Sequence, residues 1–233
     1  MSLMFSDFHW AYLVGDLVIG SPIWTFLYYY RPDLRREMIT SGILLGVAAV
    51  LSDSIFWRDY WQPEELNLLR VYIGDFFYGF FFGGISSVIY EETFGKHYMQ
   101  RQNRRRHWRR FALPLSSVGL VTFIVPIKYS GLNSIYSLII ALCVTTLILI
   151  YFRNDLIWDA IASGVLFGFI TLVGFIIFTH LYPGIVEAWW KVENISGIFI
   201  LGVPLEELLF SFALGAAVGP AYEFFVGLQF KKH

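Results

Sequence analysis

The chain has 233 residues, of which 57% are hydrophobic, 19% aromatic and only 15% charged, and its formal net charge is −1. Soluble domains carry roughly a quarter charged residues, and a mean hydropathy of +0.59 excludes a water-soluble protein of this size. The single cysteine, Cys143, lies within an apolar run, which excludes a disulfide framework and a thiolate metal site.

Seven stretches reach or approach the length of about 20 apolar residues that a helix needs to cross a bilayer. In chain order they are 8–29, 38–56, 71–94, 111–128, 135–152, 157–179 and 204–227. Runs such as 134–143 do not alternate apolar and polar residues, so the strands of a membrane barrel are excluded. The expected fold class is an all-α integral membrane protein with seven transmembrane helices in a single membrane domain, 1–233.

Basic residues collect in the loops on one side of these spans. Most of the 17 Lys and Arg residues lie there: Arg31, Arg35, Arg36, Lys96, Arg101, Arg104, Arg105, Arg106, Arg109, Arg110, Arg153, Lys231 and Lys232. The positive-inside rule makes this side cytoplasmic, which predicts a cell-membrane protein with its N-terminus outside and its C-terminus in the cytoplasm. We interpret the basic run 96–110 as a topology determinant lying on lipid headgroups, so no nucleic-acid partner is expected.

An internal duplication relates the two halves of the chain. Residues 31–46 align without gaps to 153–168 with eight of 16 positions identical, and 75–95 align to 207–227. Asp75 falls opposite Glu207 in this alignment, and Trp57 falls opposite Trp189. The prediction is two parallel three-helix repeats, 8–95 and 133–227, joined by a connector helix at 111–128.

Carboxyl groups at membrane depth are candidates for function, because an unpaired charge in hydrocarbon costs several kcal/mol. Candidates in the half predicted to be outer include Asp16, which lies eight residues into the first span, and the following acids: Asp53, Asp59, Asp75, Glu206 and Glu207. Sites in duplicated membrane proteins lie where the copies meet, so we expect Asp75 to face Glu206 and Glu207. By contrast, Glu91, Glu92 and Glu223 neighbour basic loops, and ion pairing is the favoured interpretation for them.

Pro204 to Phe212 (Pro-Leu-Glu-Glu-Leu-Leu-Phe-Ser-Phe), preceded by Trp190 and by 194–199, resembles the Pro-x-Glu-Glu signature of the membrane-embedded lycopene cyclase domain family. These are duplicated, non-flavin carotenoid cyclases. The resemblance implies a redox-neutral cyclisation of an acyclic carotenoid end group, without metal or cofactor. Repeat one departs from the signature, since Tyr72-Ile73-Gly74-Asp75 lacks the proline and a second acid.

The resemblance implies that Glu206 or Glu207 protonates the alkene and that Asp75 is the partner carboxyl. The expected substrate-binding residues are aromatic side chains near these acids, together with one further acid: Phe76, Tyr78, Phe80, Phe210, Phe212, Trp57, Trp189 and Asp16. Aromatic faces stabilise a carbocation. The expected partners are membrane lipids and an apolar polyene or isoprenoid.

Other classes of membrane protein fit less well. A retinal protein is excluded because 204–227 contains no lysine for a Schiff base, and Asp53 and Asp59 lack the spacing of prenyltransferase magnesium motifs. A non-catalytic protein that binds or transports an isoprenoid or other lipid stays open as the alternative.

Overall fold

The computed structural model describes residues 8–63, 68–100 and 108–230. Six helical stretches in this part are long and apolar enough to cross a membrane: Ala11–Tyr30, Arg35–Phe56, Phe111–Ser130, Ser134–Phe152, Asn154–Leu181 and Leu205–Val226. The protein is therefore an all-α membrane protein, as predicted. The expected third span, 71–94, corresponds to helices α4 (Leu68–Ser86) and α5 (Ile89–Thr93) and is not among these six, so a total of seven crossings stays a prediction.

The chain divides into two compact units. The first contains residues 1–85 and 170–208, and the second contains 86–169 and 209–233. Residues 101–107 of the basic run 96–110 lie outside the described residues. Each unit is considered separately below.

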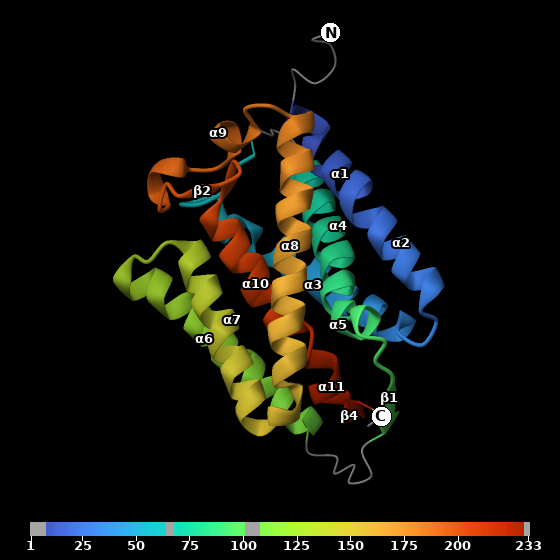
Figure 1. Cartoon of the computed structure of the whole chain (residues 1–233). Helices are drawn as coiled ribbons and strands as arrows, with labels where there is room; N and C mark the ends of the chain where they lie inside the picture. The colour runs from blue at the N-terminus through green and yellow to red at the C-terminus, as the bar shows by residue number, and fades with distance from the viewer. Residues whose placement is uncertain (1–7, 64–67, 101–107, 231–233) are drawn as a thin grey trace. The chain divides into compact units, whose positions relative to one another are not determined.

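The first unit begins with one apolar helix that contains an irregular turn. Helices α1 (Ala11–Gly15) and α2 (Ser21–Tyr30) continue into each other through a π-helical turn at Asp16–Gly20 (Figure 1). A π turn widens the helix by one residue and is frequent at functional sites. Two glycines let the second half of α8 (Ile157–Leu181) pack against it, because Gly15 contacts the Phe178 ring and Gly174 contacts Ile19.

Helix α3 (Arg35–Phe56) packs tightly on α4 within the same unit. A Cβ added to Gly42 would lie 2.6 Å from the carbonyl oxygen of Phe80, and one added to Gly46 would lie 2.8 Å from that of Phe76. Small residues at such contacts allow helix backbones to approach closely in a membrane.

A short hairpin leads into the acidic motif. Helix α9 (Ile185–Trp189) is followed by strands β2 (Phe199–Ile200) and β3 (Val203–Pro204), which pair antiparallel, and α10 (Leu205–Val218) starts directly after them. Leu201 and Gly202 between the strands both have positive φ, at 53° and 84°, as a two-residue type I′ turn requires. The hairpin thus places Glu206 and Glu207 in the first turn of α10.

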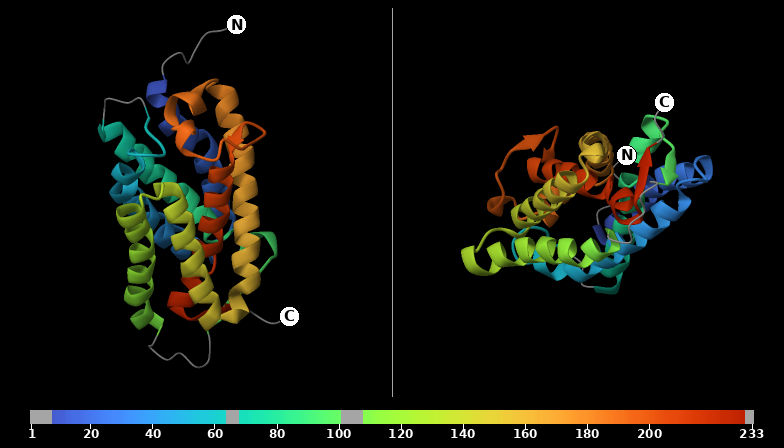
Figure 2. Two further views of the ribbon diagram at one scale, coloured as in Figure 1. Left: turned by 90° about the vertical axis from the view of Figure 1, so that its left-hand side faces the viewer. Right: turned by 90° about the horizontal axis from the view of Figure 1, so that it is seen from below.

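The second unit is built around an antiparallel helix pair. Helices α6 (Trp108–Ser130) and α7 (Ser134–Phe152) lie side by side in every view (Figures 1 and 2). Its core contains Leu115, Leu149, Leu156 and Phe224, the last from α11 (Ala221–Val226). Strands β1 (Tyr98–Gln100) and β4 (Leu228–Phe230) pair antiparallel in this unit.

Positions that the duplication treats as equivalent make similar contacts within their own units. Gly42 packs on Phe80 in the first unit and Gly164 packs on Phe212 in the second. Arg31 forms a two-pronged ion pair with Asp33, at 2.9 and 2.8 Å, and Arg153 forms the same pair with Asp155, at 2.8 and 2.7 Å. These contacts support the proposed duplication, whose repeat boundaries stay a prediction.

Candidate functional site

Asp75, the first-repeat carboxyl, is held by a tyrosine from another helix of the first unit. The hydroxyl of Tyr12 donates to Oδ1 of Asp75 at 2.9 Å, and Asp75 is 4% exposed. Gly74 makes this contact possible, because a Cβ at that position would collide with the Tyr12 ring. Gly74 occupies the position that aligns with Glu206 in the second repeat. The missing second acid is therefore replaced by an aromatic ring that contacts the remaining acid.

Two further buried carboxyl groups surround Asp75. Asp16 lies in the π-helical turn and Asp53 in the last turn of α3, so the three acids come from three separate helical stretches. Electrostatic interactions link Asp75 with both Asp16 and Asp53. In the described part of the chain, Oδ2 of each of the three accepts no hydrogen bond although it is buried. A buried charge without a cation is costly, and neighbouring carboxylates repel one another, so the cluster favours at most one carboxylate among the three acids.

Glu207 accepts hydrogen bonds from two neutral side chains. Its Oε1 accepts a hydrogen bond from the Tyr60 hydroxyl at 2.5 Å and another from the Trp190 indole N–H at 2.8 Å. Burial, and secondarily the charge of Glu207, raise the pKa of Tyr60 well above its ordinary value. Tyr60 therefore stays neutral and able to donate across the physiological pH range.

Aromatic side chains connect the two carboxyl sites. The Trp61 ring lies 5.2 Å from that of Tyr12 and 6.4 Å from that of Trp190, measured between centroids. The ring of Tyr78 lies 6.3 Å from that of Tyr12, and Tyr78 interacts electrostatically with both Glu207 and Asp16. Asp75 and Glu207 thus belong to one cluster of acids and aromatic rings within the first unit, and the predicted direct facing of Asp75 and the Glu206–Glu207 pair stays a prediction.

Glu206 has different surroundings from its neighbour. Its Oε1 accepts the backbone N–H of Ser196 at 2.8 Å, and the residue is 1% exposed, against 8% for Glu207. This bond ties the segment before the hairpin to the start of α10, which is a structural contact.

Four of the predicted substrate-binding residues contact other rings, glycines or helix ends of the first unit. Phe76 and Phe80 stack on each other at 6.0 Å and face the glycines of α3. Trp57 is the C-cap of α3, and Trp189 packs edge-on against Trp61 at 6.3 Å. Their contact with substrate stays a prediction.

Phe210 and Phe212 belong to the second unit. Phe212 packs on Gly164 of α8 and is 40% exposed. Their proposed role as substrate contacts stays a prediction too.

Sequence reasoning did not identify Tyr12, Tyr60 and Trp61 as site residues. Tyr12 precedes Asp16 by four residues, so helical spacing places both on one face, and this signal could have found it. Tyr60 and Trp61 lie in a loop, where no periodicity indicates direction.

The second unit contains its own acidic group. Glu91, Asp159 and Glu223 are buried, and one carboxyl oxygen from each lies within 4.8 Å of the others. The Ser163 hydroxyl donates to Oδ1 of Asp159 at 3.0 Å. Carboxylate oxygens are ligands for hard cations such as Mg²⁺, so these are the described residues with metal-compatible geometry, and the expectation that the protein uses no metal stays a prediction.

Comparison with known proteins supports the resemblance seen in the signature. The family model described as lycopene cyclase matches residues 133–225, less than half of the chain, and this segment contains Trp190, Glu206 and Glu207. Neither the curated proteins nor the solved structures contain a significant match to the chain. This match confirms the resemblance to the lycopene cyclase family over 133–225 and supports a carotenoid-cyclase-like function in general.

Proposed function

We propose that the protein catalyses the redox-neutral cyclisation of an acyclic carotenoid end group by proton transfer from a carboxylic acid inside the membrane. The observation that carries this proposal is the aromatic cluster of the first unit, which links the carboxyl group of Glu207 with that of Asp75. The family match over 133–225 supports the class of reaction.

We assign the role of acid to Glu207 rather than Glu206. One oxygen of Glu207 is held by Tyr60 and Trp190, while Oε2 accepts no hydrogen bond from the described residues. A proton on Oε2 can therefore be transferred without breaking these bonds. The Tyr60 and Trp190 donors also stabilise the carboxylate that remains, as donors aimed at developing charge generally do.

The reaction leaves the substrate isomeric. The Oε2 proton of Glu207 adds to the terminal alkene, and the π electrons form the new C–H bond and leave a tertiary cation. A neighbouring double bond attacks this cation and forms the ring C–C bond. A carbon next to the new cationic centre then loses a proton to the carboxylate of Asp75, and the C–H electrons form the ring double bond.

The rings around the acids suit the cationic intermediates. Tyr12, which bonds Asp75, contacts the rings of Trp61 and Tyr78, and aromatic faces attract a cation by about 0.5–2 kcal/mol each. They also exclude water, which would otherwise capture the carbocation. The proton accepted by Asp75 must return to Glu207 before the next turnover, and we assign this relay to Tyr12, which bonds Asp75, and to its neighbour Tyr78, which interacts with Glu207.

Expression in a lycopene-producing host with pigment analysis tests the proposal. The wild-type chain should form cyclic end groups, and Glu206→Gln together with Glu207→Gln should abolish them. Ring formation by the double variant would contradict the assignment. A lipid-binding or transport protein would return the polyene unchanged even when purified protein is incubated with lycopene.

The orientation in the membrane is part of the proposal, with the N-terminus outside and the C-terminus cytoplasmic. The sole cysteine, Cys143, allows a direct test. A Cys143→Ser chain with a new cysteine at one terminus should react with an impermeant thiol reagent in intact cells when that terminus is the N-terminus, and not when it is the C-terminus.

A further inference from the structure

Two loops of the first unit are joined to each other by main-chain hydrogen bonds. Gln62 donates its N–H to the carbonyl oxygen of Trp189 at 2.7 Å, and Lys191 donates its N–H to that of Tyr60 at 2.9 Å. Trp61 and Trp190 form an antiparallel bridge between these bonds. The loop after α3 (57–62) and the loop after α9 (189–194) therefore move as one element.

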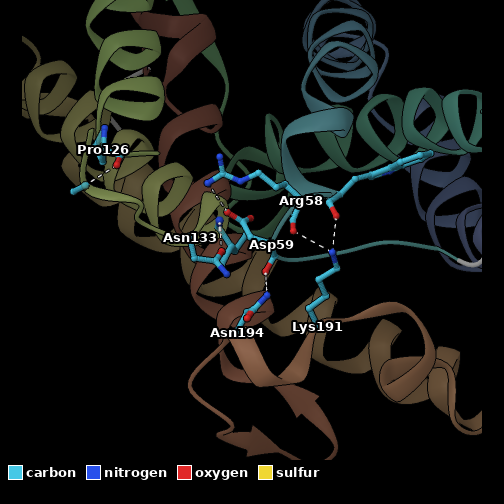
Figure 3. Close-up of polar contacts among 9 residues, drawn as sticks. Arg58, Asp59, Pro126, Asn133, Lys191 and Asn194 are labelled. Atoms are coloured by element: carbon cyan, nitrogen blue, oxygen red, sulfur yellow. Dashed lines mark hydrogen bonds and ion pairs between the residues drawn. The ribbon is translucent and has the colours of Figure 1, made fainter. Parts of the chain in front are cut away.

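Side chains of the second loop strengthen this connection at the end of α3. The Lys191 ammonium donates to the carbonyl oxygens of Trp57 and Arg58 at 2.9 and 3.0 Å, and the Asn194 amide donates to that of Asp59 at 3.0 Å (Figure 3). A cation at the C-terminal end of a helix binds carbonyls that lack helical partners and is favoured by the helix dipole. Within the described residues, Lys191 pairs with main-chain carbonyls and not with a carboxylate.

Both donors to Glu207 belong to these joined loops. Tyr60 lies in the first loop and Trp190 in the second, next to Lys191. A shift of one loop against the other would separate at least one donor from Oε1. The position of the Glu207 carboxyl group thus depends on the hydrogen bonds that join these two loops.

We propose that Lys191 and Tyr60 form a positioning device for Glu207, in which Lys191 holds the 57–62 loop in place and Tyr60 orients the carboxyl group so that Oε2 carries the transferable proton. This inference rests on the proposed function for its catalytic meaning. Neither residue transfers a proton to the substrate, so both are positioning residues. Because Lys191 acts through the loop that carries Tyr60, removing both side chains should lower kcat little more than removing the Tyr60 hydroxyl alone.

Steady-state kinetics of the purified full chain with lycopene test this dependence. Tyr60→Phe removes a bond to a group that becomes charged and should lower kcat about tenfold with KM nearly unchanged. Lys191→Met should lower kcat about threefold and Lys191→Arg should restore it, because a guanidinium can also donate to two carbonyls. The double variant Tyr60→Phe with Lys191→Met should match Tyr60→Phe alone. Multiplicative effects in the double variant, or an unchanged kcat in Tyr60→Phe, would overturn the proposal.

Arg58→Gln is the matched control. It removes an exposed side chain from the same loop but keeps the carbonyl that accepts from Lys191. Its kcat should stay within about twofold of the wild type, as surface ion pairs contribute little. A loss as large as that of Lys191→Met would assign the effect to general loop damage and overturn the role of Lys191.

Infrared spectroscopy gives a readout independent of activity. The carboxyl C=O band that disappears in Glu207→Gln should shift to higher frequency in Tyr60→Phe and in Lys191→Met, because Oε1 loses a hydrogen bond, and should not shift in Arg58→Gln. An unshifted band in Tyr60→Phe would overturn the positioning device. A shifted band in a chain that forms no rings even as wild type would support the device and contradict the proposed reaction.

Discussion

Each of the two units buries a group of carboxyl side chains, and their immediate partners differ. In the first unit, aromatic O–H and N–H groups hold Asp75 and Glu207, through Tyr12, Tyr60 and Trp190. In the second unit, a serine one turn along the same helix holds Asp159, and Gly219 packs directly against both residues. Asp75 and Glu207 thus accept hydrogen bonds from residues of other segments of the chain, whereas Asp159 accepts one from a residue of its own helix.

This difference separates two uses of a buried acid. A carboxyl group that must lose and regain a proton benefits from neutral hydrogen-bond donors, because these donors stabilise both its neutral and its charged form. A neighbouring cation would instead stabilise the charged form alone. Close packing against glycine serves the stability of a helix pair instead. We therefore expect substitutions in the first unit to affect turnover and those in the second to affect stability.

The largest expected effect is the loss of ring formation in Glu207→Gln. Glutamine keeps the acceptor oxygen for Tyr60 and Trp190 but removes the proton, and a general acid typically contributes 10²–10⁴-fold to the rate. The matched substitution in the second unit, Glu223→Gln, should retain ring formation per folded molecule. Pigment analysis with both variants measures the contrast, and equal losses would remove the functional distinction between the units.

Asp75→Asn should reduce turnover by about 100-fold. Asparagine still accepts from Tyr12, so the fold and substrate affinity should change little. Asp159→Asn is the corresponding change in the second unit and should leave kcat near the wild-type value. A fully active Asp75→Asn variant would mean that another group accepts the proton.

Two glycine substitutions should have effects of intermediate size, one on turnover and the other on stability. Gly74→Ala pushes the Tyr12 ring away from Asp75 and should lower kcat about tenfold, the order expected from a hydrogen bond to a charged group. Gly219→Ala overpacks the contact with Ser163 and should destabilise the protein by about 1–3 kcal/mol. Thermal unfolding in detergent and kinetics of both variants provide the comparison, which fails if Gly219→Ala mainly lowers kcat.

The smallest effect should come from Glu206→Gln. Its amide oxygen can still accept the N–H of Ser196, so ring formation should stay within about threefold of the wild type. Glu206→Ala, which removes the acceptor, should instead lower the unfolding temperature by a few degrees. Complete inactivation of Glu206→Gln would transfer the acid role from Glu207 to its neighbour.

The sequence by itself determined the class of protein and the approximate bounds of six spans. The expected spans 38–56, 135–152 and 157–179 correspond to Arg35–Phe56, Ser134–Phe152 and Asn154–Leu181. The lycopene cyclase resemblance is likewise confirmed over 133–225. These features are readable because the hydrophobic length of a span and a short signature are local properties of the chain.

The tertiary structure decided the surroundings of each of the two adjacent acids. Glu206 and Glu207 are adjacent in sequence and chemically identical, and they differ because Ser196 contacts one while Tyr60 and Trp190 contact the other. From the sequence, Gly74 marks the absence of a second acid, whereas in the structure it makes room for the Tyr12 ring. Donors that come from residues far apart in the chain leave no periodic pattern, since their positions depend on how loops and helices pack.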